Sequence, residues 1–289
     1  MFNTIADIAN SWDTNRVWRQ HWHKTANPQI SAASGGFWLD LSMAAGTPKY
    51  NAYVGDQLAF TPLIGGGNNG INCGTGGDSW IHRYNLSGGG TSTAAWPAGV
   101  VMLMDYVGFY PLVDMDNIDE QVFDNTLLSS RYSSGMRCMV VTTTPQTAAA
   151  PTQVFLEYEG SNGVTTVSSF FVNSTVAAGA LNCFSSATGG NVSGVAAPFV
   201  PLGPGTFDVK KLNSVTITGS SGGFCAFVLV KPILEAIIVD NATPYEIEAP
   251  RNMLPYYVPN GAYLNHIVCG NSGSAATGIT RGHITFVRR

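Results

Sequence analysis

The residues best suited to chemistry are six acidic side chains gathered in one short stretch of the chain. Between Met104 and Asn125, the sequence MDYVGFYPLVDMDNIDEQVFDN contains a third of the eighteen Asp and Glu residues: Asp105, Asp114, Asp116, Asp119, Glu120 and Asp124. Carboxylate oxygens are calcium ligands, and two carboxyl groups at the right separation hydrolyse glycosidic bonds. The stretch raises three possibilities: a metal site, a catalytic site or a contact surface.

The spacing of these carboxylates does not match the commonest calcium loop. An EF-hand needs an oxygen ligand at position five, glycine at six and a bidentate Glu at twelve. Counted from Asp114, these positions hold Ile118, Asp119 and Asn125. An irregular ion site at Asp114, Asp116 and Asp119 stays open, as does a carboxylate pair. We favour a turn after an apolar strand, in which these three aspartates contact a partner.

Other motifs also fall short of a catalytic set. The segment CGNSGSAATG, 269–278, is similar to the nucleophile segment of trypsin-like proteases, but Asn271 stands at the Asp position and a base with an orienting acid is lacking. His21 and His23 are only two potential metal ligands, and IGGGNNG lacks the Gly-Lys-Ser/Thr ending of a phosphate loop. We therefore predict no catalytic residue, no cofactor site and no metal site.

The composition is poor in charge. Charged residues make up 11% of the 289 residues, against about 25% in typical soluble domains. The chain has 14 Phe, 11 Tyr and 6 Trp, so it has the aromatic content that disordered chains lack. One interpretation is a compact, polar but uncharged β surface. The other is a surface covered by further copies of the chain or by partners.

Charge and cysteine patterns exclude several classes. The net charge is −4 without a Lys/Arg block, which argues against direct nucleic-acid binding. No apolar run reaches ~18 residues, so no membrane span is predicted, and the N-terminus does not have the pattern of a secretory signal. The five cysteines are far apart and form no Cys-x-x-Cys pair, which favours buried, reduced thiols and assembly in the cytoplasm.

Most of the chain has the texture of short β-strands. VVMLMDYVGFYPLV, RCMVVTTTP and RGHITFVRR are rich in branched and aromatic residues. Two alternating runs flank Ser161-Asn162-Gly163 and predict a hairpin; a second hairpin is predicted across residues 219–223. Helical patterns do not alternate with the strands. We predict a mainly β protein, an antiparallel β-sandwich or barrel-like (jelly-roll-like) domain.

The first 27 residues differ from the rest because they contain neither Gly nor Pro. Apolar residues recur there at helical spacing, imperfectly, and Trp12, Trp18 and Trp22 lie within eleven residues. We predict an N-terminal arm over residues 1–33, helical or extended, whose tryptophans bind a partner. The alternative is a segment that packs on its own domain. Residues 34–289 form the β-rich domain, with a soft subdivision near 125–131.

A resemblance covers residues 100–287. MDYVGFYPLVDMDNIDEQVFDNT, SSRYSSGMRCMVVTTTP, APFVPLGPGTFDVKKLNSVTITGSSGGFCAFVLVKPI and NGAYLN with GHITFV look like a type of structural protein found in the virions of tailed bacteriophages. The resemblance implies a role in the particle and carries over no catalytic residue. A long spine helix, as in the major shell protein, is not predicted here.

This resemblance favours a non-enzymatic head decoration or cement protein. Its expected partners are further copies of itself, as a trimer or dimer, and the major capsid protein; its expected place is the virion, assembled in the host cytoplasm. A tail, baseplate or fibre component is the alternative, and a polysaccharide-degrading tail enzyme is the second alternative.

Overall fold

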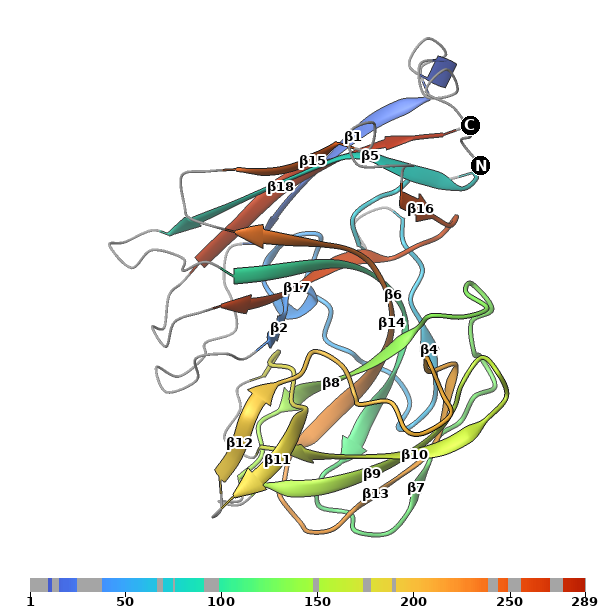
Figure 1. The fold of residues 1–289 in the computed structure, drawn as a ribbon, viewed down its shortest axis with the longest axis vertical. Helices are drawn as coiled ribbons and strands as arrows, with labels where there is room; N and C mark the ends of the chain where they lie inside the picture. Colours follow the sequence, from blue (N-terminus) through green and yellow to red (C-terminus); the bar gives the residue numbers. More distant parts are fainter. Residues whose placement is uncertain are drawn as a thin grey trace.

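The computed structural model describes residues 10–11, 16–24, 38–66, 70–74, 76–90, 99–147, 151–173, 178–188, 191–238, 244–248, 256–270 and 278–288. The regular secondary structure of the described part is almost entirely β-strand, arranged in three antiparallel sheets of six strands each. Figure 1 shows them one below the other, so that the central sheet packs with one sheet above and one below. The predicted fold class, a mainly β antiparallel sandwich, is confirmed. The sheets do not close into a barrel.

The upper sheet has the order β15-β5-β18-β1-β3, with β16 also paired to β5. Its strands are β1 (Val17–Lys24), β3 (Gly46–Thr47), β5 (Ser79–Gly90), β15 (Tyr245–Glu248), β16 (Tyr256–Val258) and β18 (Gly278–Val287). From Val17 the expected arm is extended and forms β1, which pairs with β18 as far as Lys24. This segment is therefore an internal strand of the sheet, between β18 and β3.

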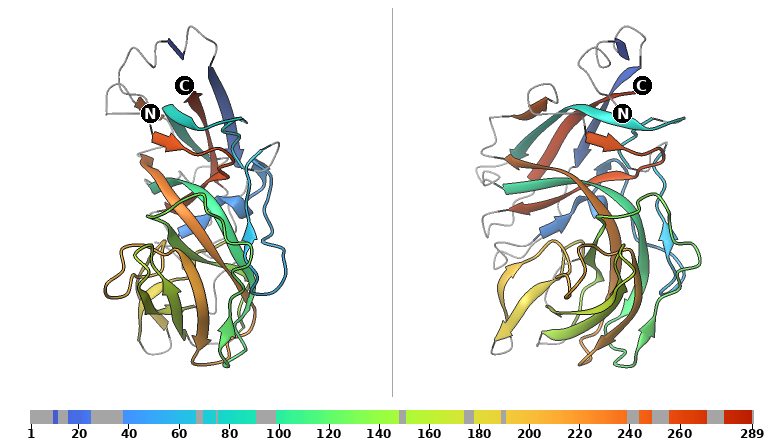
Figure 2. Two further views of the ribbon diagram at one scale, coloured as in Figure 1. Left: turned by 90° about the vertical axis from the view of Figure 1, so that its right-hand side faces the viewer. Right: turned by 45° about the vertical axis from the view of Figure 1, so that its right-hand side comes forward.

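The central sheet has the order β2-β17-β6-β14-β8, with β4 paired to β6. It contains β2 (Trp38–Asp40), β4 (Thr61–Pro62), β6 (Gly99–Asp114), β8 (Arg137–Thr144), β14 (Phe224–Ile238) and β17 (Leu264–Gly270); a short 3-10 helix, η1 (Leu41–Met43), follows β2. The strands β6 and β14 are the longest, and they curve from the upper to the lower part of the molecule (Figures 1 and 2).

The lower sheet has the order β12-β11-β10-β9-β13-β7. Its strands are β7 (Gln121–Val122), β9 (Thr152–Glu159), β10 (Thr165–Val172), β11 (Phe184–Thr188), β12 (Asn191–Ala196) and β13 (Lys211–Ile217). The predicted hairpin across residues 161–163 is confirmed: β9 and β10 pair along their full length. Gly163 has φ +76°, a left-handed backbone conformation that glycine adopts without steric strain.

The second predicted hairpin is wrong. Strands do flank residues 219–223, but β13 pairs with β9 and β7 in the lower sheet, whereas β14 pairs with β6 and β8 in the central sheet. Gly222 and Gly223, with φ +72° and +75°, turn the chain between the two sheets. A glycine-rich turn between two strand-like runs does not distinguish a hairpin from a change of sheet.

Among the described residues, three large hydrophobic clusters hold the sheets together, and two of them, here called the two cores, lie between sheets. One lies between the upper and central sheets and includes Trp22, Tyr84 and Leu103. The other lies between the central and lower sheets and includes Tyr110 and Tyr158. Both β6 and β14 contribute to both cores, so neither core belongs to one continuous part of the chain.

β-Bulges make this sharing possible. Register shifts interrupt the pairing of β14 with β6 in three places, one of them between Pro232 and Leu234. Bulges bend a strand and increase its twist. Gly108 lies on the bent part of β6, where an added Cβ would approach the ring of Phe60 to 2.2 Å. Only a residue without a side chain fits this contact.

The cysteines are unpaired. Cys73, Cys138, Cys183 and Cys225 are buried and Cys269 is half-buried. Burial raises the pKa of the Cys183 and Cys225 thiols to about 12, so the thiolate is disfavoured. The prediction of buried thiols is confirmed for four of the five.

Candidate functional site: an aromatic cleft between the two cores

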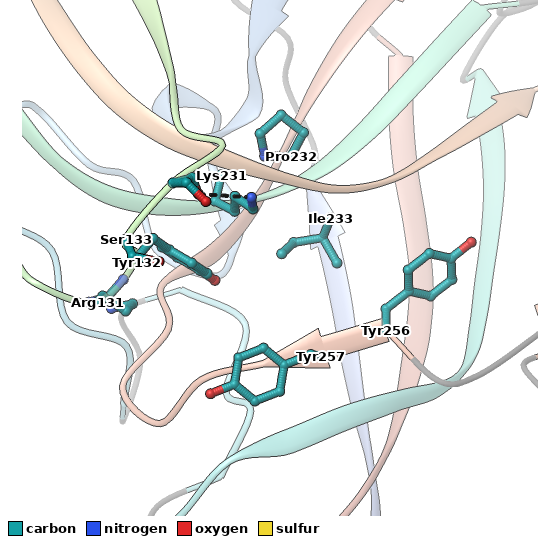
Figure 3. A pocket seen from close by; sticks show the side chains of 9 residues that line it. Arg131, Tyr132, Ser133, Lys231, Pro232, Ile233, Tyr256 and Tyr257 are labelled. Carbon is teal, nitrogen blue, oxygen red and sulfur yellow. Dashed lines mark hydrogen bonds between the residues drawn. The ribbon is translucent and has the colours of Figure 1, made fainter. Parts of the chain in front are cut away.

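A cleft of about 430 Å³ opens between Ile233, which packs on the core of the upper and central sheets, and Tyr132, which packs on the core of the central and lower sheets. It is lined by the loop before β8, the middle of β14 and the edge strand β16: Arg131, Tyr132, Ser133, Ser134, Lys231, Pro232, Ile233, Tyr256 and Tyr257. Figure 3 shows these side chains around the opening, with Tyr132 and Tyr257 on one side and Tyr256 on the other. The volume lies within the range of small-ligand and side-chain pockets.

A buried ion pair lies next to the cleft. Asp105 of β6 is the cross-strand neighbour of Lys231 on β14. The Arg131 guanidinium donates to Asp105 Oδ1 at 2.7 Å, and the Tyr263 backbone N–H donates to the same oxygen at 2.8 Å. Burial raises the pKa of Asp105, and the charge of Arg131 opposes that rise. Arg131 also donates to the carbonyl oxygen of Leu63, so the pair fixes the loop that forms one wall.

Lys231 brings a cationic group to the cleft. Its ammonium donates to the carbonyl oxygen of Ser134 at 3.0 Å and lies 5.7 Å from the centre of the Tyr132 ring. At this distance the cation is attracted by the ring face. The dashed line in Figure 3 marks the bond to Ser134. An ammonium held this way can still interact with a further aromatic ring or an anion.

Strand β16 contributes two tyrosines to the lining of the cleft. Tyr256 is 37% exposed and Tyr257 is 46% exposed, although both belong to a paired strand. The Tyr257 ring lies 5.8 Å from that of Trp80. Partial burial and a hydrogen bond with Asp78 raise the pKa of Tyr257, so it is a neutral phenol at physiological pH.

The lining of the cleft is suited to binding. It offers aromatic faces, hydroxyl groups and cationic nitrogens, which hold aromatic or anionic groups. The adjoining carboxylate, Asp105, is fully buried and already accepts from Arg131 and the backbone. The lining residues therefore do not present the pair of carboxyl groups that glycoside hydrolysis uses.

The predicted partner-binding tryptophans lie in different settings. Trp22 is only 1% exposed and belongs to the core between the upper and central sheets. Trp18 is half-buried, stacks on Phe286 at 5.5 Å and has the Arg288 guanidinium 4.9 Å above its ring. Trp12 lies outside the described residues. Both described tryptophans pack on their own domain.

The predicted acidic site is a tightly turned loop after β6. Asp114 accepts the Asp116 backbone N–H at 2.9 Å, and Asp116 accepts the Gly222 backbone N–H at 2.8 Å and the Ser220 hydroxyl. Asp119 is exposed, and its backbone N–H donates to Asn117 at 3.0 Å. The structure brings Asp114 and Asp116 into one hydrogen-bonded turn that joins this loop to the turn between β13 and β14.

The remaining candidates do not assemble into a site. His21 lies opposite His283 across the β1–β18 pair, with ring centres 5.7 Å apart. Within the described ranges, no three His, Cys, Asp or Glu side chains gather closely enough to hold a metal ion. Ser272, the serine of the segment 269–278 that is similar to a protease nucleophile segment, lies outside those ranges. None of the helices placed in the structure is long and apolar enough to cross a membrane.

A second carboxylate with a raised pKa is sealed in the interior. Asp40 is fully buried and accepts hydrogen bonds from the Tyr106 hydroxyl at 2.7 Å, the Ser42 hydroxyl at 2.7 Å, the Ser42 backbone at 2.8 Å and the Tyr53 hydroxyl. Burial raises its pKa, and these hydrogen bonds oppose the rise. Perturbed carboxylates often mark active sites, but substrate cannot reach this one, so its role is structural.

A second buried group, His266, lies in the core between the upper and central sheets. Its ring is fully buried, 4.1 Å from the centre of the Trp22 ring and 5.9 Å from that of Tyr84. Neither ring nitrogen has a hydrogen-bond partner among the residues that the structure describes. Burial, together with the nearby charge of Lys24, lowers the pKa of His266 to about 3. The imidazole is therefore neutral at physiological pH.

Comparisons with known proteins give little to set beside this geometry. The chain matches no protein-family model and no curated protein. Among solved structures, it is similar to the VP2 subviral particle of infectious bursal disease virus, with 7% identity over 94% of this chain and 81% of that chain, and a TM-score of 0.22. A TM-score this low supports no conclusion about this chain.

The sequence did not single out the residues of the cleft. Tyr132, Lys231, Tyr256 and Tyr257 come from three separate segments and share no motif spacing. One signal was present: Tyr256 and Tyr257 are adjacent, so on a strand they face opposite sides, and one of them has to leave the core.

Proposed function

We propose that the chain is a non-enzymatic structural protein of a virion, and specifically a decoration or cement protein of a tailed-bacteriophage head. The resemblance of residues 100–287 to such proteins suggests the role. The observation that carries it best is the surface: a chain with 11% charged residues exposes large, ordered apolar side chains, among them Phe207 at 82% and Val54 at 79%. Such side chains gain stability when another subunit covers them.

In this role the protein acts through surface contact. It binds the head shell, formed by the major capsid protein, and further copies of itself. Permanent assemblies bury roughly 2,000 Å² or more at each interface, and a β domain with three packed sheets offers rigid surfaces for such contacts. The exposed apolar side chains such as Val54 are contact points for the shell, and the cleft is a contact point for a further copy of the chain.

The proposal is tested on the source particle. Purified heads and tails are separated, and the copy number of this chain is measured by quantitative mass spectrometry relative to the shell protein. We expect the chain in the head fraction at a fixed ratio set by the shell lattice, with electron microscopy placing it on the outer surface. Recovery in the tail fraction at few copies, or absence from particles, would contradict the proposal.

A further inference from the structure

A rigid aromatic side chain projects from the lower half of the molecule. Phe207 is 82% exposed, yet the residues on either side of it are buried and anchored. The Thr206 hydroxyl lies 2.8 Å from the Tyr158 hydroxyl. The Asp208 carboxylate accepts the backbone N–H of Ser161 at 2.8 Å and that of Gly135 at 2.5 Å. With both neighbours fixed inward, the phenyl ring is held outward.

An exposed apolar residue lies at the base of the loop that carries this ring. A Cβ on Gly205 would lie 3.9 Å from Val164, which is 40% exposed, and one on Gly203 would lie 2.6 Å from the Thr166 hydroxyl oxygen, so the loop runs along the start of β10. The phenyl ring, which projects from this loop, is here called the Phe207 knob.

The Phe207 knob lies beside the cleft. Asp208, the residue after Phe207, is bonded to Gly135, the residue after Ser134. Ser134 lines the cleft and accepts from Lys231. The hydrogen bond between Asp208 and Gly135 thus connects the knob to the wall of the cleft. The same region of the surface therefore carries both a projection and a hollow.

The two features match in size and chemistry. A cleft of about 430 Å³ is large enough for a phenyl ring. Its tyrosines offer edge-to-face contacts with a phenyl ring, and the Lys231 ammonium offers a cation for the ring face. A self-complementary surface of this kind is what a two-fold dimer uses, since each copy both donates and receives.

We propose that two copies of this chain associate about a two-fold axis, with the Phe207 knob of each copy seated in the aromatic cleft of the other. Each dimer then buries two phenyl rings and covers four tyrosines of β16. Because the two-fold axis makes the same knob-in-cleft contact twice, the dimer buries twice the surface of a single contact. The dimer belongs to the isolated chain and does not need the shell.

Site-directed cross-linking tests the geometry. A Phe207→Cys chain is mixed with a differently tagged Ser133→Cys chain under mild oxidation. Ser133 is exposed on the rim of the cleft, so neither substitution disturbs a core. We expect a disulfide-linked heterodimer joining the two tags. The matched control is Val54→Cys, equally exposed at 79%, which should not cross-link to the Ser133→Cys chain; the unmodified chain controls for native thiols.

Sedimentation equilibrium tests the energetics on the same protein. The unmodified chain should behave as a dimer, and Phe207→Ala should weaken association by roughly 100-fold or more, because two rings leave the interface at once. Val54→Ala should leave association unchanged.

Three outcomes would overturn the proposal. The first is a monomer at all concentrations. The second is cross-linking only between two copies of the Phe207→Cys chain, and the third is cross-linking of the Val54→Cys chain to the Ser133→Cys chain at an equal yield. Since these measurements use the isolated chain, their failure is distinct from failure of the particle test.

Discussion

Acid should destabilise this protein through His266. Its pKa is about 3 in the folded state and about 6.5 in an unfolded chain. Above pH 6.5 the ring is neutral in both states and its titration contributes nothing. As the pH falls below 6.5, the unfolded chain takes up a proton that the folded chain refuses, so stability is lost progressively until the pH approaches 3.

The size of the effect follows from the gap between the two values. About pH 4.5 is two units below the pKa of this ring in the unfolded chain. At about 1.4 kcal/mol per unit, the free energy of unfolding falls by about 3 kcal/mol. This is a large share of the 5–15 kcal/mol that typically separates folded and unfolded domains. The cause is the burial of the ring against Trp22, without a described partner for either nitrogen, together with the nearby charge of Lys24.

The perturbation is His266→Leu, of similar volume and unable to take up a proton. Urea unfolding of both chains, followed by tryptophan fluorescence, gives the free energy of unfolding at about pH 7 and about pH 4.5. The pKa values of Asp40 and Asp105 are raised by burial, so these groups act in the opposite direction. They are present in both chains, and the difference between chains removes them.

We expect the stability of the unmodified chain to fall by about 3 kcal/mol relative to His266→Leu between the two pH values. His266→Gln should show the same relative shift, because it also lacks the proton site. A difference that stays constant with pH would show that His266 is solvated or hydrogen-bonded in the folded protein, and would refute the reasoning.

Three further predictions concern the core and the cleft. Arg131→Met should cost about 3–5 kcal/mol in urea unfolding by leaving Asp105 buried and unpaired; Arg131→Met with Asp105→Asn should recover much of it, and no recovery would contradict the pairing. Trp22→Ala should cost about 3–5 kcal/mol because its ring fills the core, whereas a cost under about 1 kcal/mol would place the ring outside the core. Gly108→Ala should lower the unfolding free energy by about 1–3 kcal/mol through contact with Phe60; an unchanged value would mean that the strand relaxes freely.

The positions of several strands could be predicted from the sequence because strand formation depends on residues that are close together along the chain. Alternation and branched residues located β6, β8, β9, β10 and β18, and Asn162-Gly163 located a hairpin. The pairing of β13 and β14 was not readable, because the glycines at 222 and 223 permit both a hairpin and a change of sheet. The choice depends on partners far away in the sequence, such as β9 for β13 and β6 for β14.

The cleft was hidden for the same reason. In the sequence, Lys231 is a single charged residue that interrupts an apolar run. Only its pairing with Asp105 across β14 and β6 shows that it lies between two cores. The acidic stretch was conspicuous by composition, yet the oxygens of Asp114 and Asp116 accept backbone N–H groups. A cluster of acidic residues in the sequence indicates a chemical site only when the fold leaves their carboxylate oxygens free to bind a ligand.

Two strands that belong to both cores have a mechanical consequence. A force applied at one end of the molecule reaches the other end along the covalent backbone of β6 and β14, with no flexible linker to absorb it. Neither half can melt without releasing the strands on which the other is built, so calorimetry should record one transition instead of two. Such a stiff, all-or-none body would keep its shape under load until it fails as a whole.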